Sequence, residues 1–332
     1  MSAVSLGASP SAGATPPKKA APPNIRVGLL ADVGGLNDHG FNHLSYVGVL
    51  EAHQKLGVAY SVVQATSSAD YLPALTNFAR SGDQAIIADA FLEAQALQQV
   101  SKEFPHQHYM MNDDIVKGPN ITSIYYETQQ CGYLAGYLAG LVQKEHALPH
   151  INGDNTVGIV GGQEIPPVNT YIAGFIGGIR AVDPTVHILL KYTGTFSDPS
   201  TGASYAQAEI ADHADIVWPV AGGTGLGVIS QAKKEHVYAI GVDANQNYLA
   251  PGTVITSAEK NVSVAVFDFI KSVKDGTVKP GVRRLGLSQD GVGIAPPIKA
   301  VPRSIVAKVD QLEKEIVAGK VVPPTTIPKN LL

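Results

Sequence analysis

The chain has 332 residues, of which 45% are hydrophobic and 16% charged, and its net charge is −4 at pH 7. This composition is typical of a soluble globular protein, and the length allows two domains. The small negative charge gives no reason to expect nucleic acid or a membrane surface as a partner. No apolar run reaches the roughly 18 residues that a membrane-spanning helix needs.

Residues 1–24 are rich in Ala, Ser, Pro and Gly and have no apolar periodicity. Such a segment buries too little apolar surface to offset its ordering entropy, so we predict a disordered N-terminal tether. The single cysteine, Cys131, excludes an intramolecular disulfide and a cysteine-based metal site. Its apolar helical surroundings favour a buried core residue.

From residue 25 onward, short apolar runs alternate with amphipathic segments. The predicted strands of the first half cover 25–32, 60–65, 84–90, 108–113 and 122–127. One helix is predicted to follow a cap at Asn37 or Asp38, and two more cover 71–80 and 92–104. This alternation predicts right-handed crossovers and a parallel sheet.

After a helix over 130–146, the same order of elements begins again. The predicted strands of the second half cover 156–162, 187–194, 215–221, 237–243 and 254–260. The predicted helices between them cover 168–182, 203–213 and 225–235. Two similar α/β halves predict two Rossmann-like lobes with parallel sheets, and a ligand cleft between the lobes is then the expected site.

The C-terminal tail is expected to cross back between the lobes. Its predicted elements are a helix over 262–274, short strands over 284–288 and 291–295, and a helix over 305–319. The predicted N-terminal lobe is 25–128 plus about 261–290, and the predicted C-terminal lobe is 129–260 plus about 291–332.

Polar and glycine residues follow the first predicted strand, at the edge where ligands bind in such sheets. Asp32 and Asp38 supply acceptors, and Gly35, like the glycine before it, allows close approach of the backbone. Phe41 offers a flat apolar face and Asn42 a donor with an acceptor, which would match a base or a sugar ring. The alternatives are a core role for Phe41 and helix capping by Asp38.

Later strand ends carry further candidates. Asp113 ends the fourth strand, as Asp89 ends the third, and such carboxylates either accept hydrogen bonds from hydroxyls or cap the next helix. Phe196 lies in a loop after a strand, where it would either face Phe41 across the cleft or pack within its own loop. A base stacked on an aromatic ring gains about 1–3 kcal/mol.

The segment 222–227 (GGTGLG) does not have the spacing of a dinucleotide fingerprint. We interpret Gly222 as part of a turn that brings backbone N–H groups near a ligand, with a phosphate at that helix N-terminus as the alternative. Asp243 and Lys260 end adjacent strands and together would suit the vicinal hydroxyls of a ribose. The alternative is a structural ion pair.

Catalytic patterns are missing from the sequence. There is no G-x-S-x-G, P-loop or kinase motif, and His39 and His43 share helical spacing without an H-E-x-x-H motif. We therefore predict no enzymatic activity, no catalytic residue, no metal and no cofactor.

Seven segments carry a resemblance to the basic membrane protein family of ABC-transporter substrate-binding lipoproteins, which includes purine nucleoside receptors. The resemblance covers about residues 25–322. The segments are 32–42 (DVGGLNDHGFN), 126–140 (YETQQCGYLAGYLAG), 158–162 (GIVGG), 173–184 (AGFIGGIRAVDP), 221–229 (AGGTGLGVI), 241–246 (GVDANQ) and 257–266 (SAEKNVSVAV).

This resemblance implies a type I periplasmic-binding fold with two lobes on a hinge and a nucleoside ligand of the adenosine, guanosine or inosine class. It implies ABC permease subunits as partners, a monomer and no nucleic acid. The base would lie between Phe41 and Phe196, with its edge read by Asn42 and the acidic groups beside it. The ribose would be held by the Gly222 backbone, Asp113, Asp243 and Lys260.

The resemblance also implies an extracytoplasmic location, in the periplasm or at the outer face of the cell membrane. The family's lipid-carrying cysteine is not found in residues 1–24, so an anchor would lie in a segment that this sequence does not include. Asn245, Ser263 and Ala90 depart from the family pattern and leave the preferred nucleoside open. The alternatives are a sensor that signals to a regulator, a binder of another sugar-like or heterocyclic ligand, and a nucleoside hydrolase.

Overall fold

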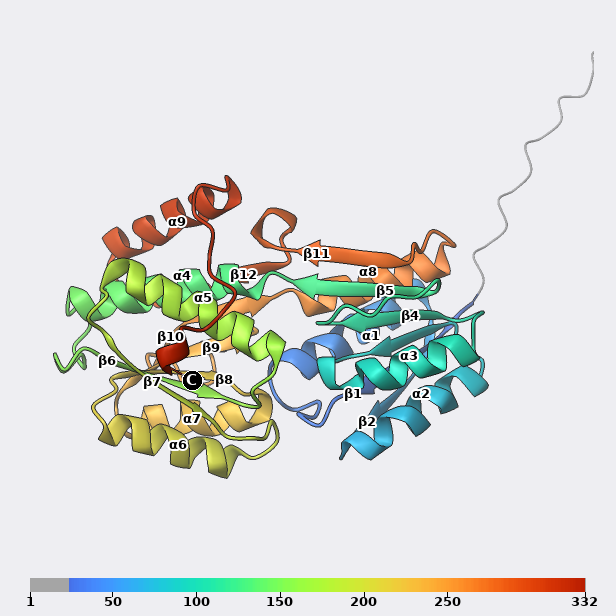
Figure 1. Cartoon of the computed structure of the whole chain (residues 1–332), viewed down its shortest axis with the longest axis horizontal. Coiled ribbons are helices and arrows are strands. Elements are labelled where there is room, and N and C mark those ends of the chain that lie inside the picture. Colours follow the sequence, from blue (N-terminus) through green and yellow to red (C-terminus); the bar gives the residue numbers. More distant parts are fainter. Residues whose placement is uncertain (1–23, 332) are drawn as a thin grey trace, which may run out of the picture.

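The computed structural model describes residues 24–331, and all but the last residue of the predicted tether lies outside this range. Two α/β lobes lie side by side (Figure 1). Each lobe is built on one six-stranded sheet, in which five strands come from the half of the chain predicted for it and the sixth comes from the C-terminal tail. None of the helices in the described range is both long and apolar enough to cross a bilayer.

The first sheet is parallel throughout. Its spatial order is β11-β5-β4-β3-β1-β2. The strands are β1 (Arg26–Ala31), β2 (Ala59–Gln64), β3 (Ala85–Ala88), β4 (His108–Asn112), β5 (Ile121–Tyr126) and β11 (Gly281–Leu285). Helices α1 (Phe41–Leu56) and α8 (Val262–Lys274) pack together on one face, and α2 (Tyr71–Arg80) and α3 (Ala94–Glu103) on the other.

The second sheet has the order β12-β10-β9-β8-β6-β7, and only its edge strand β12 runs antiparallel to its neighbour. The strands are β6 (Thr156–Gly161), β7 (His187–Tyr192), β8 (Ile216–Val220), β9 (Tyr238–Asp243), β10 (Val254–Lys260) and β12 (Val292–Ile294). Its two faces are covered by α4 (Thr128–Lys144) with α5 (Pro166–Val182) and by α6 (Pro199–Ala211) with α7 (Gly222–Lys234). Helix α9 (Arg303–Val317) packs on α4.

The apolar pattern of the strands explains the layers. Successive residues of a strand point to opposite faces, so Leu29 of β1 joins the core under α1 and α8, whereas Leu30 joins the core under α2 and α3. Both faces of each sheet are covered, which is why the strands contain nearly continuous apolar runs.

Several helices begin earlier than predicted. Helix α6 begins at Pro199 instead of residue 203, because proline fits the first helical turn and Asp198 accepts hydrogen bonds from the N–H groups of Ser200 and Thr201. Helix α7 begins at Gly222 instead of residue 225, so the glycine-rich segment forms its first turns. The predicted strand over 284–288 is observed earlier, as β11.

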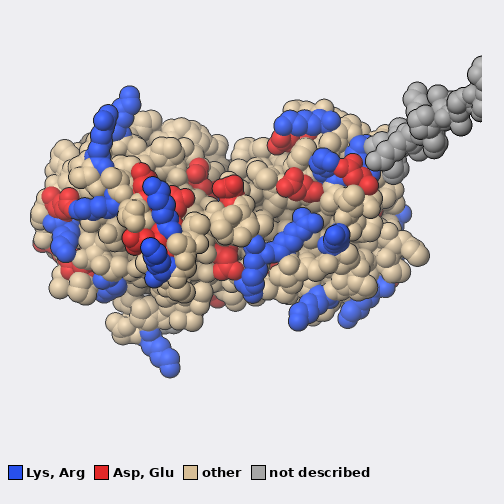
Figure 2. Space-filling model, turned by 90° about the horizontal axis from the view of Figure 1, so that it is seen from above, with Lys and Arg blue, Asp and Glu red and all other residues tan. Residues whose placement is uncertain are grey.

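The chain passes between the two sheets three times: from β5 to α4, from β10 to α8, and from β11 to β12. The tail therefore does cross between the lobes, although the exact lobe limits stay a prediction. In the view of Figure 2, Lys and Arg are interspersed with Asp and Glu over both lobes. The crossings lie at the β5 and β10 side of the sheets, and this fixes the side on which the lobes are joined.

Candidate functional site

A cavity lies between the carboxyl ends of the strands of the two sheets, with about 600 Å³ of empty space that is partly open to solvent. Residues that follow β1, β3 and β4 line it from the first lobe, and residues that follow β8, or that end β9 and β10, line it from the second. The predicted residues that line it are Asp32, Asp38, Phe41, Asn42, Asp113, Phe196, Gly222, Asp243 and Lys260. The topology therefore brings to one place side chains more than 200 residues apart in sequence.

Gly35 is the exception among the predicted residues, because Gly34 lines the cavity in its place. The Gly35 N–H donates to the Asp32 carbonyl and closes a turn, with a φ of 74° that favours glycine. A Cβ on Gly34 would come within 2.8 Å of the Asn42 amide nitrogen. Close approach is thus required at Gly34, and left-handed backbone at Gly35.

Asp38 acts as a helix cap, the alternative that the sequence left open. Its carboxylate accepts hydrogen bonds from the backbone N–H groups of Gly40, Asn42 and His43 at 2.9–3.0 Å. It also accepts one from the Asn42 side-chain amide at 3.1 Å. Burial raises the pKa of Asp38, and these N–H donors oppose that shift. Asp38 therefore holds the corner and the start of α1 in place.

Asn42 is held from two sides, because its side-chain oxygen also accepts a hydrogen bond from the Asp32 N–H at 2.8 Å. One N–H of its amide is then left for other partners. The Asp32 carboxylate accepts a hydrogen bond from the Tyr71 hydroxyl, and burial raises the pKa of Asp32. A carboxylate has about four acceptor positions, so Asp32 keeps acceptor capacity toward the cavity.

An ion-pair cluster forms the opposite part of the cavity. Lys260 Nζ lies 2.7 Å from Asp113 Oδ2 and 3.5 Å from Asp243 Oδ1, and its side chain is only 3% exposed. The Tyr171 hydroxyl donates to Asp243 Oδ1 at 3.3 Å. Burial lowers the pKa of Lys260, but Asp113 and Asp243 raise it by more, so the ammonium stays charged.

The backbone conformation orients the carboxylates of Asp113 and Asp243. Asp113 and Asp243 have φ angles of 65° and 63°, the left-handed conformation that short polar residues tolerate. Lys260 Nζ also lies 4.6 Å from the centre of the Phe41 ring and 5.1 Å from that of Tyr171. Aromatic faces stabilise a buried cation, so they add to the two carboxylates in holding Lys260 in one position.

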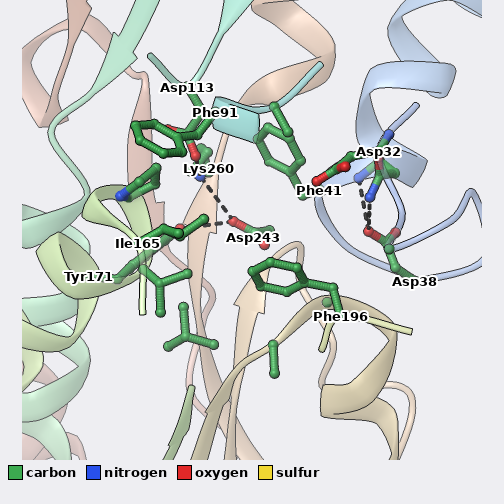
Figure 3. A pocket seen from close by; sticks show the side chains of 18 residues that line it. Asp32, Asp38, Phe41, Phe91, Asp113, Ile165, Tyr171, Phe196, Asp243 and Lys260 are labelled. Carbon is green, nitrogen blue, oxygen red and sulfur yellow. Dashed lines mark hydrogen bonds and ion pairs between the residues drawn. The ribbon is translucent and has the colours of Figure 1, made fainter. Parts of the chain in front are cut away.

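Phe41 and Phe196 flank the cavity from different lobes, and Figure 3 shows their rings with the Asp243 carboxylate and the Lys260 ammonium beside them. Phe41 is the first residue of α1, and Phe196 lies in the loop between β7 and α6. The Phe196 ring lies against Gly162, where a Cβ would come within 2.2 Å of it. The glycine thus makes room for the aromatic wall.

Sequence reasoning missed part of the lining, mostly apolar residues of the second lobe. Phe91 directly follows the corner after β3, so the sequence did offer a signal for it. Tyr171 lies inside α5, where nothing in the sequence distinguishes it from a core tyrosine. The lining residues outside the predicted set are Gly34, Ala90, Phe91, Ile165, Pro167, Val168, Tyr171, Val220 and Ala221.

Among residues 24–331, no group of His, Cys, Asp and Glu has the arrangement of a metal site. Two α/β lobes with mainly parallel sheets, and a cavity between their strand ends, define the class of two-lobed solute-binding proteins. A solved ABC-transporter solute-binding protein from Aeropyrum pernix K1 superposes with a TM-score of 0.84 at 26% identity, over 90% of this chain and 94% of that one.

The chain belongs to the PnrA-like family of ABC transporter substrate-binding proteins, whose model matches residues 25–326. A lipoprotein of Pyrococcus horikoshii is 32% identical over 81% of this chain and 68% of its own length. The ABC transporter nucleoside-binding protein BmpA of Lactococcus lactis is 26% identical over 91% of this chain and 90% of its own. The predicted family is thereby confirmed.

Proposed function

We propose that this ABC transporter substrate-binding protein takes a purine nucleoside into the cavity between its lobes and delivers it, outside the cytoplasm, to a permease. The observation that carries the proposal is one cavity with two aromatic walls, Phe41 and Phe196, beside the cluster of Asp113, Asp243 and Lys260. A flat heterocycle joined to a hydroxylated sugar matches both parts. A nucleoside-binding relative of similar length supports the same ligand class.

The aromatic part suits a purine base. Stacking on an aromatic ring contributes about 1–3 kcal/mol per base and does not depend on which base is bound. Discrimination between one base and another then depends on the polar groups at that end. These are the free acceptor positions of Asp32 and the remaining amide N–H of Asn42. Because Asp38 is occupied by backbone N–H groups, we assign it no direct contact with the base.

The ion-pair cluster suits the ribose. Vicinal hydroxyls both donate and accept hydrogen bonds, and the cluster offers two carboxylate acceptors with one ammonium donor. Since these groups are buried and already hydrogen-bonded, they are preorganised and lose little freedom on binding.

Charge favours a nucleoside over a nucleotide. Among the residues that the structure describes, four carboxylates but a single ammonium line the cavity, and the ammonium already lies beside two of those carboxylates. A phosphate group would meet uncompensated negative charge in a site from which closure excludes water, where charge repulsion is strong. We therefore expect adenosine, guanosine or inosine to bind far more tightly than their 5′-monophosphates.

Isothermal titration with these three nucleosides, their monophosphates, free ribose and galactose tests the proposal. Binding of at least one nucleoside with no measurable binding of its monophosphate supports it. The absence of heat with every nucleoside at millimolar concentration overturns it, and binding of a free sugar alone would favour the sugar-binding alternative. Chromatography of the nucleoside after long incubation tests the hydrolase alternative, for which we expect no product.

A further inference from the structure

Two hydrogen bonds join the lobes at positions that do not line the cavity. The Nδ1 atom of His39, in the corner between β1 and α1, lies 2.8 Å from the hydroxyl of Tyr248, in the segment between β9 and β10. The Gln246 side-chain amide donates to the His39 carbonyl oxygen at 3.1 Å. None of these three residues lines the cavity.

Both sides of this contact are firmly held. On the first lobe, the Asp38 carboxylate binds the N–H of Gly40, the residue after His39, and His39 has a φ of 51°. On the second lobe, Gln246 is 2% exposed, its side-chain oxygen accepts from Val242 N–H, and its own N–H donates to the Ser257 hydroxyl. The hydrogen bonds therefore join two rigid surfaces.

On the first lobe the contact lies two strands away from the joints between the lobes, whereas on the second lobe it follows β9, the strand next to β10. In the first sheet, β4 and β3 separate β1 from β5, the strand at which the chain crosses to the second lobe. A rotation about the three crossings would move the corner after β1 away from the segment after β9. We therefore expect both hydrogen bonds to break when the lobes open.

We infer that His39, Gln246 and Tyr248 form an interlobe clasp that sets how long a bound nucleoside is retained. The inference rests on the proposed function. Bonds made only in the closed state favour that state, so they slow dissociation without touching the ligand. Association begins from the open state, in which the clasp is not formed, and its rate is independent of these residues.

Tyr248→Phe removes only the hydroxyl of a side chain that is 60% exposed, so the fold tolerates it. Loss of one such hydrogen bond should speed nucleoside dissociation about threefold. His39→Asn keeps a residue type that accepts the left-handed backbone but is too short to reach Tyr248, and it should have a similar effect. The double variant should be no worse than either single one, because both remove the same bond.

Stopped-flow measurements of association and dissociation rates give the test, with Tyr205→Phe on α6 as the matched control. Faster dissociation at an unchanged association rate, in the clasp variants only, supports the clasp. Wild-type dissociation in Tyr248→Phe, or fully additive effects in the double variant, overturns it while leaving the proposed function intact. A wild-type protein that binds no nucleoside overturns the proposed function and the clasp together.

Discussion

Asp243 connects three features of the site: a left-handed backbone, the Tyr171 hydroxyl and the Lys260 ammonium. Asp243→Ala should weaken nucleoside binding by at least about 2 kcal/mol, because it leaves buried donors without an acceptor. Asp243→Asn keeps the shape and the backbone preference and should lose less. Titration calorimetry measures both, and an unchanged dissociation constant for Asp243→Ala would remove this residue from the site.

Gly162 does not line the cavity, but it determines where the Phe196 ring can lie. A Cβ at this position would lie 2.2 Å from the Phe196 ring, so Gly162→Ala must displace the ring. We expect a loss of about 1–3 kcal/mol in nucleoside affinity, the value of one stacking contact. Gly293→Ala is the control, because its Cβ would meet no atom within 4 Å. Equal affinities of the two variants would show that Phe196 does not contact the base.

At the scale of the elements, a left-handed glycine follows some of the described helices and a left-handed histidine follows others. Six helices end in a Schellman motif, with a left-handed residue after the last turn. Helices α2, α8 and α9 use Gly82, Gly276 and Gly319 there, whereas α4, α6 and α7 of the second lobe use His146, His213 and His236. A side chain in this conformation strains the backbone, so these three histidines cost stability.

His146→Gly should therefore stabilise the protein by about 0.5–1 kcal/mol, since His146 is exposed and its backbone already has a φ of 45°. His146→Ala keeps the strain and should give no gain, which makes it the matched control. Urea denaturation of the three proteins compares their free energies of unfolding. An equal gain from alanine would mean that the imidazole, not the backbone angle, is the cause.

Helix α6 places the side chain of Glu209 in the core. Both carboxylate oxygens of Glu209 are buried without a hydrogen-bond partner among the described residues, and one would lie 2.3 Å from a Cβ on Gly158. Burial raises the pKa of Glu209 from 4.5 to about 8. The folded state thus holds a proton that the unfolded state releases above about pH 4.5.

The raised pKa of Glu209 makes the free energy of unfolding depend on pH. The contribution of Glu209 to stability is complete below pH 4.5, falls as the pH rises toward about 8, and then stays constant. Glu209→Gln should remove that fall and unfold at a higher urea concentration than the wild type at pH 8.5. The two unfolding free energies, measured from pH 5 to pH 9, give the comparison. Parallel curves would show that Glu209 titrates alike in both states.

At the scale of the whole molecule, the alternation of apolar runs and amphipathic segments was enough to predict two lobes, whereas the family came from the resemblance of seven short segments. The same pattern predicted the edge at which the site lies, because strand ends are visible in the sequence. The sequence did not show which side chains contact each other in the folded protein. Asp243 was the predicted partner of Lys260 because their strands are neighbours, yet Asp113 of the other lobe lies closer.

The reason is topological. Strand β10 leaves its sheet at Lys260 to enter α8, which packs on the first lobe, so the last side chain of β10 reaches the end of β4. No pattern within either half of the sequence contains that information. Tyr171 escaped prediction for a similar reason, since only the packing of α5 turns its hydroxyl toward Asp243.

Because the chain passes between the two sheets three times, the lobes are completed in a fixed order during synthesis. The first sheet lacks its edge strand, and α1 lacks its packing partner α8, until the ribosome has made residues 262–285. By then every strand of the second sheet except β12 has already been made. The N-terminal lobe, although begun first, is therefore completed only after most of its neighbour, and a nascent chain paused between them exposes an apolar helix face.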